Sequence, residues 1–265
     1  AYGFVQDPGV MCLGYLSILL WVMGHPDQAL QRSHEMLALA KQLTHPYSLA
    51  YALTGAAETY RLCGQLPAAH ELEATAQALS HEHGFPFWLA DGSIFRGWDL
   101  VQQGQGKEGI VHMRQGMAAL RTQGVKLGWS YLCGMLATAY GQVEQPAEGL
   151  SVLAEAMESE DKMNKSALYR IKGELMLQQC KVQGSKFKVD KAPRSKACPE
   201  PSRRVQSPKS SKTKSQILNP KSQEDAEACF LKAIEVSRHQ QAKSLELRAT
   251  MSLSRLWQQQ GKQRE

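Results

Sequence analysis

A turn motif that recurs every forty residues constrains the fold of this chain more than any other feature. GHPDQAL at 24–30 is followed by GQLPAAH at 64–70, GQGKEGI at 104–110 and EQPAEGL at 144–150. An apolar segment precedes each motif, and a more polar segment with proline or alanine near its start follows it. Glycine permits a left-handed turn, and proline at the first position of a helix forfeits no hydrogen bond. The pattern predicts helical hairpins, each with an apolar helix A and a polar helix B. The expected B helices are Pro26–Leu43, Pro67–His81, Lys107–Thr122 and Pro146–Glu158.

Small residues keep the same forty-residue register. The first set lies seven positions before each turn and consists of Ser17, Ala57, Gly97 and Ala137. The second set lies five positions after each turn and consists of Ala29, Ala69, Gly109 and Gly149. The third set lies twelve positions after each turn and consists of Met36, Ala76, Gly116 and Ala156. We expect helices to approach closely at these positions. The pattern resembles the tetratricopeptide repeat, although a period of 40 in place of 34 implies longer helices or turns.

A fifth hairpin is interrupted in the sequence. Helix A is expected at Ser166–Cys180, with Gly173 as its small residue, and helix B begins near Glu224, where Ala226, Phe230 and Ala233 fit the repeat. Residues 181–221 between them hold 12 Lys and Arg against 2 Asp and Glu, a balance of +10, whereas the rest of the chain balances at −4, from 19 basic and 23 acidic residues. Richness in Lys, Ser and Pro without apolar periodicity predicts a disordered insert.

These features predict an all-α protein, a tetratricopeptide-like right-handed helical solenoid of about five and a half hairpins with one disordered insert. Residues 1–180 hold repeats 1–4 and helix A of repeat 5. Residues 181–222 are the basic insert, and residues 223–265 hold helix B of repeat 5 and helix A of a truncated repeat 6, expected at Glu246–Gln260.

Three stretches also resemble a family. HGFPFWLADGSIFRGWDLVQQGQGKEGI at 83–110, LYRIKGELMLQQ at 168–179 and AEACFLKAIEVSRHQQAKSLELRATMSLSRLWQQQGK at 226–262 resemble the C-terminal repeat region of large bacterial signalling ATPases, many of which also carry a class III adenylate/guanylate cyclase domain. The resemblance implies a cytoplasmic regulatory region and a partner domain upstream in the same polypeptide. The chain starts at Ala1, not Met, and we expect it to be a fragment. No P-loop and no cyclase aspartates are present, so no activity is carried onto any residue here.

Other function classes find little support in the sequence. His81-Glu82-His83 lacks metal-ligand spacing, because residues two apart on a helix do not share a face, and we expect no metal and no cofactor. The basic insert has one aromatic residue, Phe187, which disfavours base stacking, so nucleic-acid binding is not expected. The apolar run Val10–Met23 is about 14 residues, short of the roughly 20 that span a bilayer, so no membrane partner is expected.

The best functional candidate is the concave face that helix A lines in tetratricopeptide arrays. Residues 13, 10, 6 and 3 before each turn point into it, and aromatic and arginine side chains there suit peptide binding. This rule selects a partner-binding groove of Tyr51, Thr54, Glu58, Arg61, Asp91, Trp98, Tyr131, Thr138, Arg170, Glu174, Arg248 and Arg255. In the first repeat it selects Met11, Gly14, Ile18 and Trp21, an apolar face that we expect a preceding repeat or domain to cover.

The sequence therefore predicts a non-catalytic regulatory module that binds a protein or peptide in its groove. The alternative is a sensor solenoid that binds a small effector, as in related transcriptional or signalling regulators. An enzyme is not expected, because no cluster of titratable residues has a usable spacing.

Overall fold

Every described part of the chain in this computed structural model is helical or a turn between helices. The structure describes residues 6–126, 128–158, 164–189 and 220–262, with the backbone alone over 182–189. Within these ranges there are eleven α-helices and no strand. They are α1 (Pro8–Val22), α2 (Pro26–Gln42), α3 (Pro46–Leu62), α4 (Leu66–His83), α5 (Pro86–Gln102), α6 (Gly106–Thr122), α7 (Trp129–Gln142), α8 (Pro146–Glu158), α9 (Lys165–Val189), α10 (Pro220–His239) and α11 (Lys243–Gln260). The prediction of an all-α hairpin array is confirmed.

The turns follow a stricter rule than the forty-residue period suggests, because a left-handed residue occurs every twenty positions. Positive φ angles are found at Gly24, Thr44, Gly64, Gly84, Gly104, Gly124 and Glu144, and again at Gln241 and Gly261. At each A-to-B turn the next amide closes a six-residue hydrogen-bonded loop, as in His25 N to Leu20 O at 2.8 Å and Gln105 N to Leu100 O at 2.8 Å. This is the Schellman arrangement, which satisfies carbonyls that the helix end leaves without partners.

The small residues lie where helices meet, as expected. All four residues of each predicted set are buried. A Cβ built on Gly109 would lie 2.3 Å from the carbonyl oxygen of Gly97, and one on Gly116 would lie 2.5 Å from that of Ala90. Helices α5 and α6 therefore pack backbone against backbone, and no larger side chain fits between them without moving an axis.

The fifth hairpin forms as predicted, although its boundaries differ. Helices α9 and α10 pack together, and Gly173 faces Phe230, which is 1% exposed. Helix α9 continues to Val189, beyond the boundary expected at 180, and α10 begins at Pro220, earlier than 223. Extending an existing helix costs little, and no proline intervenes before position 193. The rest of the insert, 190–219, with its predicted disorder, lies outside the described residues.

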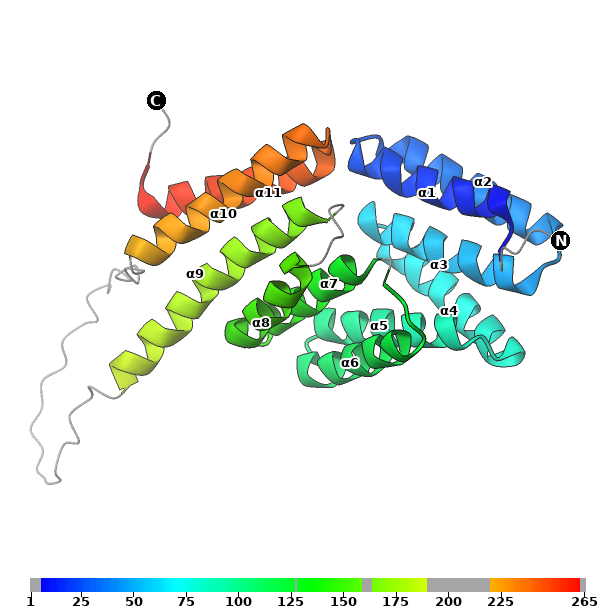
Figure 1. Ribbon diagram of the computed structural model, residues 1–265, viewed down its shortest axis with the longest axis horizontal. Helices are drawn as coiled ribbons and strands as arrows, with labels where there is room; N and C mark the ends of the chain where they lie inside the picture. The colour runs from blue at the N-terminus through cyan, green and yellow to red at the C-terminus, as the bar shows by residue number, and fades with distance from the viewer. Residues whose placement is uncertain (1–5, 127, 159–163, 190–219, 263–265) are drawn as a thin grey trace, which may run out of the picture.

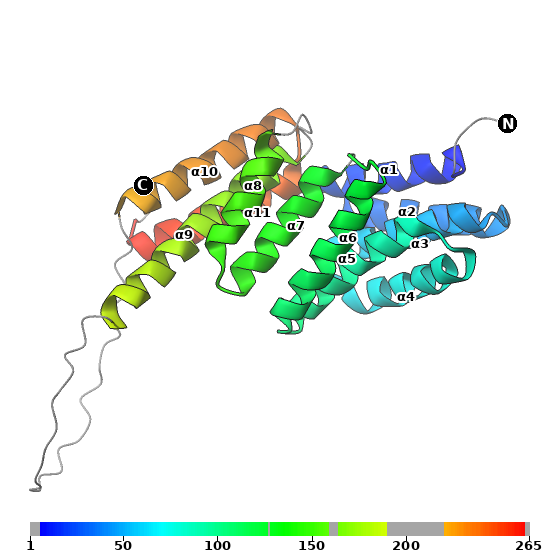
Figure 2. The same ribbon diagram turned by 60° about the horizontal axis from the view of Figure 1, so that its bottom comes forward.

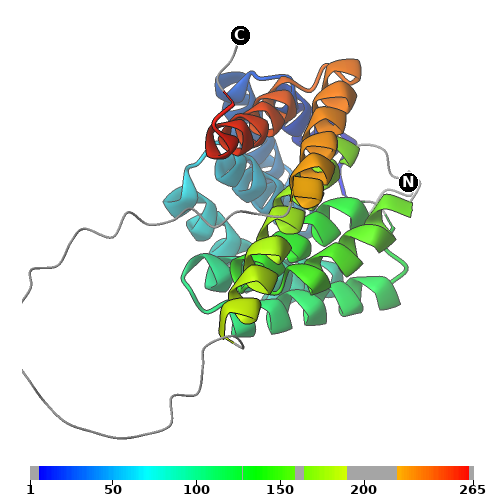
Figure 3. The same ribbon diagram turned by 90° about the vertical axis from the view of Figure 1, so that its left-hand side faces the viewer.

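The A helices of successive hairpins contact one another, and the last of them also contacts the first. Helices α1, α3, α5, α7, α9 and α11 contact one another in that order, and α11 also contacts α1. In Figure 1 the blue N-terminal hairpin and the orange-to-red C-terminal helices meet at the top of the view. Figure 2 shows α5, α6 and α7 side by side in the middle of the molecule, between the C-terminal helices and the N-terminal helices. The side view in Figure 3 shows the orange-to-red C-terminal helices in front of the blue hairpin.

The contact between α1 and α11 accounts for the burial of Trp21, one of the four residues on the apolar face of the first repeat. The Ser244 hydroxyl donates to the Trp21 carbonyl oxygen at 2.5 Å, and the Arg248 guanidinium lies 4.7 Å from the centre of the Trp21 ring. Trp21 is 7% exposed. The last helix of the same chain, not a preceding repeat, thus covers this residue.

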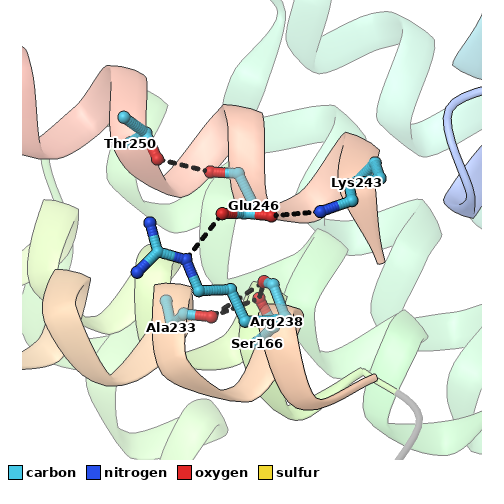
Figure 4. A network of polar contacts seen from close by, with 7 residues as sticks. Ser166, Ala233, Arg238, Lys243, Glu246 and Thr250 are labelled. Carbon is cyan, nitrogen blue, oxygen red and sulfur yellow. Dashed lines mark hydrogen bonds and ion pairs between the residues drawn. The ribbon is translucent and has the colours of Figure 1, made fainter. Parts of the chain in front are cut away.

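A polar network joins the last three helices (Figure 4). The Ser166 hydroxyl of α9 donates to the Ala233 carbonyl of α10 at 3.0 Å. Across the turn to α11, Glu246 accepts from Arg238 Nε at 2.7 Å and from Lys243 Nζ at 3.2 Å. The bond between Arg238 and Glu246 thus links the end of α10 to the first turn of α11 at the surface of the protein.

Among the residues that the structure describes, none of the helices has the length and hydropathy needed to cross a bilayer.

Candidate functional site

A partly buried charged cluster lies where α3, α4, α5 and α7 face one another. Its centre is Arg61, three residues before the turn of the second hairpin. The Arg61 side chain is 9% exposed and forms an ion pair with Glu73 of α4, whose side chain is 14% exposed. The guanidinium also lies 4.5 Å from the centre of the Phe95 ring on α5. Aromatic stacking and the ion pair together fix the orientation of this arginine.

Two of the guanidinium nitrogens remain without partners. Glu73 contacts Nη2, whereas Nε and Nη1 are buried and have no hydrogen-bond acceptor in the described part of the chain. A buried donor without an acceptor costs about 1–3 kcal/mol, and more when it is charged. Arg61 therefore has two enclosed donors whose hydrogen-bonding capacity is not used within the described residues.

Two more carboxylates complete the cluster. Glu58 on α3 forms a hydrogen bond with the Tyr131 hydroxyl on α7, and burial raises the pKa of Glu58 although Arg61 opposes the shift. Burial also raises the pKa of Asp91 on α5 to about 7, with Glu58 and Glu73 adding repulsion and Arg61 opposing them. Three acidic groups thus face one arginine, and the raised pKa of Asp91 shows that its surroundings favour the neutral acid.

A second group of charges adjoins the cluster on the α9 and α11 side. Arg170 donates to both carboxylate oxygens of Glu174 at 2.8 and 2.9 Å, and the Ser252 hydroxyl donates to Glu174 at 2.7 Å. Desolvation, followed by repulsion from Arg170, lowers the pKa of Arg248, and Tyr131 opposes this shift. Tyr131 therefore interacts electrostatically with the charged cluster, through Glu58, and with the adjoining group, through Arg248.

The structure separates the predicted groove residues into distinct environments. Glu58, Arg61, Asp91 and Tyr131 form the cluster, and Arg170, Glu174 and Arg248 lie in the adjoining group. Tyr51 packs against Trp88 at 5.9 Å between ring centres and donates to the Met11 carbonyl at 3.3 Å, and Trp98 packs on the main hydrophobic core. Thr54 and Thr138 bond to backbone carbonyls of their own helices, and Arg255 is exposed on α11. The structure thus brings seven of these twelve residues into two adjoining groups.

Glu73 belongs to the cluster but is absent from the predicted groove, because the selection rule considers helix A only. One signal in the sequence could have identified it. Glu73 is four residues after Ala69 and three before Ala76, so it occupies the buried small-residue stripe of α4. A charged residue within a buried stripe requires a partner, and the only arginine in the same hairpin is Arg61.

The chemistry of the cluster suits binding. It offers fixed donors on Arg61 and fixed acceptors on Glu58 and Asp91. The one fully buried thiol among the described residues, Cys133, has its pKa raised to about 12 by burial, so it stays protonated at neutral pH. No three His, Cys, Asp or Glu residues in the described ranges are grouped so that they could hold a metal ion.

Comparisons with known proteins identify no family for this chain. No family model matches it, and no curated protein does. Among solved structures, it is similar to a putative kinesin light chain of Podosopora anserina described as having nearly identical TPR-like repeats, with 16% identity and a TM-score of 0.46. The match covers 70% of this chain and 94% of the other. A similarity this distant carries no conclusion about function.

Proposed function

We propose that this chain is a non-catalytic interaction module that binds a protein or peptide segment along the face formed by its A helices. The observation that supports this most strongly is the charged cluster on this face, where Arg61 has two buried nitrogens without acceptors and interacts electrostatically with Glu58 and Asp91. A preorganised donor next to preorganised acceptors matches the alternating carbonyl and amide groups of a polypeptide.

The test uses peptides selected against the purified chain from a random display library. Their dissociation constants are then measured by fluorescence anisotropy for wild type, Arg61→Lys and Arg121→Lys. Lysine retains a charge for Glu73 but removes Nε and Nη1, so binding should weaken about tenfold while helicity is unchanged. Arg121 is exposed on α6, a B helix outside this face, and its replacement should leave binding unaffected. Selected peptides that bind Arg61→Lys as well as wild type would count against this face.

The small-effector sensor remains a second candidate, because Arg61 is only 9% exposed. A deeply shielded arginine is reached more readily by a small molecule than by an extended chain. A thermal-shift screen against a metabolite panel separates the two, since a ligand that binds only the folded state raises the melting temperature.

A finer proposal places the chain in the regulatory tail of a bacterial signalling ATPase or nucleotide cyclase, acting in the cytoplasm on an upstream domain of the same polypeptide. The support is the resemblance of residues 83–110, 168–179 and 226–262. Sequencing the gene upstream of the Ala1 codon tests this directly. An in-frame P-loop is the expected result, and a nearby start codon with nothing else before it would refute the proposal.

A further inference from the structure

The series of A helices closes where the C-terminal end of α1 meets the N-terminal end of α11 (Figure 1). The Ser244 hydroxyl donates to the Trp21 carbonyl oxygen at 2.5 Å, across 223 positions of the sequence. The Arg248 guanidinium lies 4.7 Å from the centre of the Trp21 ring, and a Cβ built on Gly24 would lie 3.2 Å from the Lys243 Cβ. These five residues form a seam that closes the series of A helices into a ring.

Every other pair of neighbouring A helices is supported by a B helix that packs against both. Helix α2 packs against α1 and α3, α4 against α3 and α5, and α6 against α5 and α7; likewise, α8 packs against α7 and α9, and α10 against α9 and α11. Among the described helices, none contacts both α11 and α1. Opening the seam therefore breaks the seam contacts alone, whereas opening another junction also pulls a B helix away from an A helix.

The seam borders the charged cluster. Trp21 Nε1 donates to the Leu62 carbonyl oxygen at 3.0 Å, and Leu62 directly follows Arg61 at the end of α3. This bond attaches Trp21 to α3, so Trp21 stays beside Arg61 when α11 moves away. Arg248 of α11 interacts electrostatically with Tyr131, a member of the cluster. Helix α11 thus contributes a side chain near the cluster, and its departure removes that side chain.

The closed ring shields Arg61 from a peptide. Its side chain is 9% exposed, and Nε and Nη1 are enclosed although no acceptor among the described residues reaches them. Glu73 of α4 and Phe95 of α5 lie against the guanidinium. Because a ligand needs a path to these donors, the ring must open before an extended chain can reach them. The seam is the junction whose opening leaves the packing between hairpins intact.

We infer that the seam is a gate, at which α11 separates from Trp21 and admits a peptide to the face formed by the A helices. This inference rests on the proposed function and specifies its route of access. Arg248 is exposed, and a cation–π contact at an exposed site and a neutral hydrogen bond are both weak interactions. The closed ring therefore exchanges with a minor open form, and the fraction of open form limits the apparent affinity for the peptide.

A reversible crosslink in the whole chain tests the gate. In the variant with Gly24→Cys and Lys243→Cys, two Cβ atoms that lie 3.2 Å apart in the structure approach the roughly 3.5–4.5 Å of a disulfide. Gly24 has a φ of 90°, but Glu144 occupies the equivalent turn of the fourth hairpin with a φ of 59°, so another residue type is accommodated at this kind of turn. Oxidised glutathione forms the crosslink, peptide mapping verifies the pairing, and the same preparation after reduction is the matched control.

The measurement is the association rate of peptides selected on the wild-type chain. The oxidised variant should bind at least about tenfold more slowly than the same protein after reduction. A second variant weakens the seam without new cysteines. Ser244→Ala removes the hydrogen bond to Trp21 and should raise the apparent affinity about twofold to tenfold, whereas Ser151→Ala, exposed on α8, should leave it unchanged. Circular dichroism verifies that each variant is folded.

The outcomes separate the gate from the proposed function. Equal rates for the oxidised and reduced protein, or a folded variant in which the crosslink does not form, overturn the gate. If the peptides still lose affinity with Arg61→Lys, the proposed binding face stands and the ligand enters elsewhere. Peptides that the crosslink slows but that ignore Arg61→Lys support the gate and refute the role of Arg61. A library that yields no binding peptide refutes both.

Discussion

The substitution Asp91→Asn should stabilise the protein, and only above mildly acidic pH. The pKa of Asp91 is raised to about 7 from 3.8, first by burial and then by Glu58 and Glu73. Between these two values the folded state holds a proton that the unfolded state has released. Stability therefore falls as pH rises from about 4 to about 7, and the full penalty is present above 7. Asparagine cannot ionise, so it removes the penalty.

The magnitude follows from the size of the shift. A change of roughly three pKa units corresponds to about 4 kcal/mol at 1.36 kcal/mol per unit. Asp91 is only partly shielded from solvent, and screening reduces this upper bound to about 2 kcal/mol. We expect Asp91→Asn to exceed wild type by about 2 kcal/mol at pH 8, and by well under 1 kcal/mol at about pH 4.

Urea unfolding followed by circular dichroism measures this difference at both pH values. The slope of each transition must match between the proteins, because a changed slope in a repeat array indicates partial unfolding. Glu155→Gln serves as the control, since this exposed carboxylate should show no comparable pH dependence. A stability gain that is the same at both pH values, or a loss at pH 8, would falsify the assignment of Asp91 as a partly shielded, destabilising acid.

Three further perturbations test the packing, the turns and the closure of the array. Gly109→Ala should lower the free energy of unfolding by about 1–3 kcal/mol, because its Cβ would lie 2.3 Å from a backbone carbonyl oxygen. Gly134→Ala, whose Cβ would have ordinary contacts at 3.4 Å, should be neutral or stabilising, and equal losses of stability for both variants in urea unfolding would contradict this account. Thr44→Gly should stabilise by about 0.5–1 kcal/mol, since a β-branched residue with φ of +48° is strained where the equivalent turns have glycine; a lower melting temperature would show that the strain is not there. Arg248→Ala should speed amide hydrogen exchange in α1 and α11, because it removes the contact with Trp21, whereas Arg255→Ala, at an exposed position on the same helix, should not. Equal exchange rates in both variants would argue that this contact does not hold α11 against α1.

The sequence alone determined the repeating unit. Turn residues, the proline that starts a helix and small residues at contact positions act within one or two neighbouring helices, so their spacing is readable without a structure. This local character is why Gly97 and Gly109 could be placed at a helix contact, and why Ala226, Phe230 and Ala233 identified a hairpin whose halves are separated by the insert. The same spacing placed Glu58, Arg61, Asp91 and Tyr131 on one face.

Only the tertiary structure decided how that face is closed and which charges meet within it. The rotation from one hairpin to the next accumulates over six helices before α11 reaches Trp21, and no local pattern encodes that sum. Likewise, Glu73 is recognisable as Arg61's partner only once α4 has been placed against α3. The raised pKa of Asp91 arises from desolvation and from acids on two other helices, quantities that exist only in the packed array.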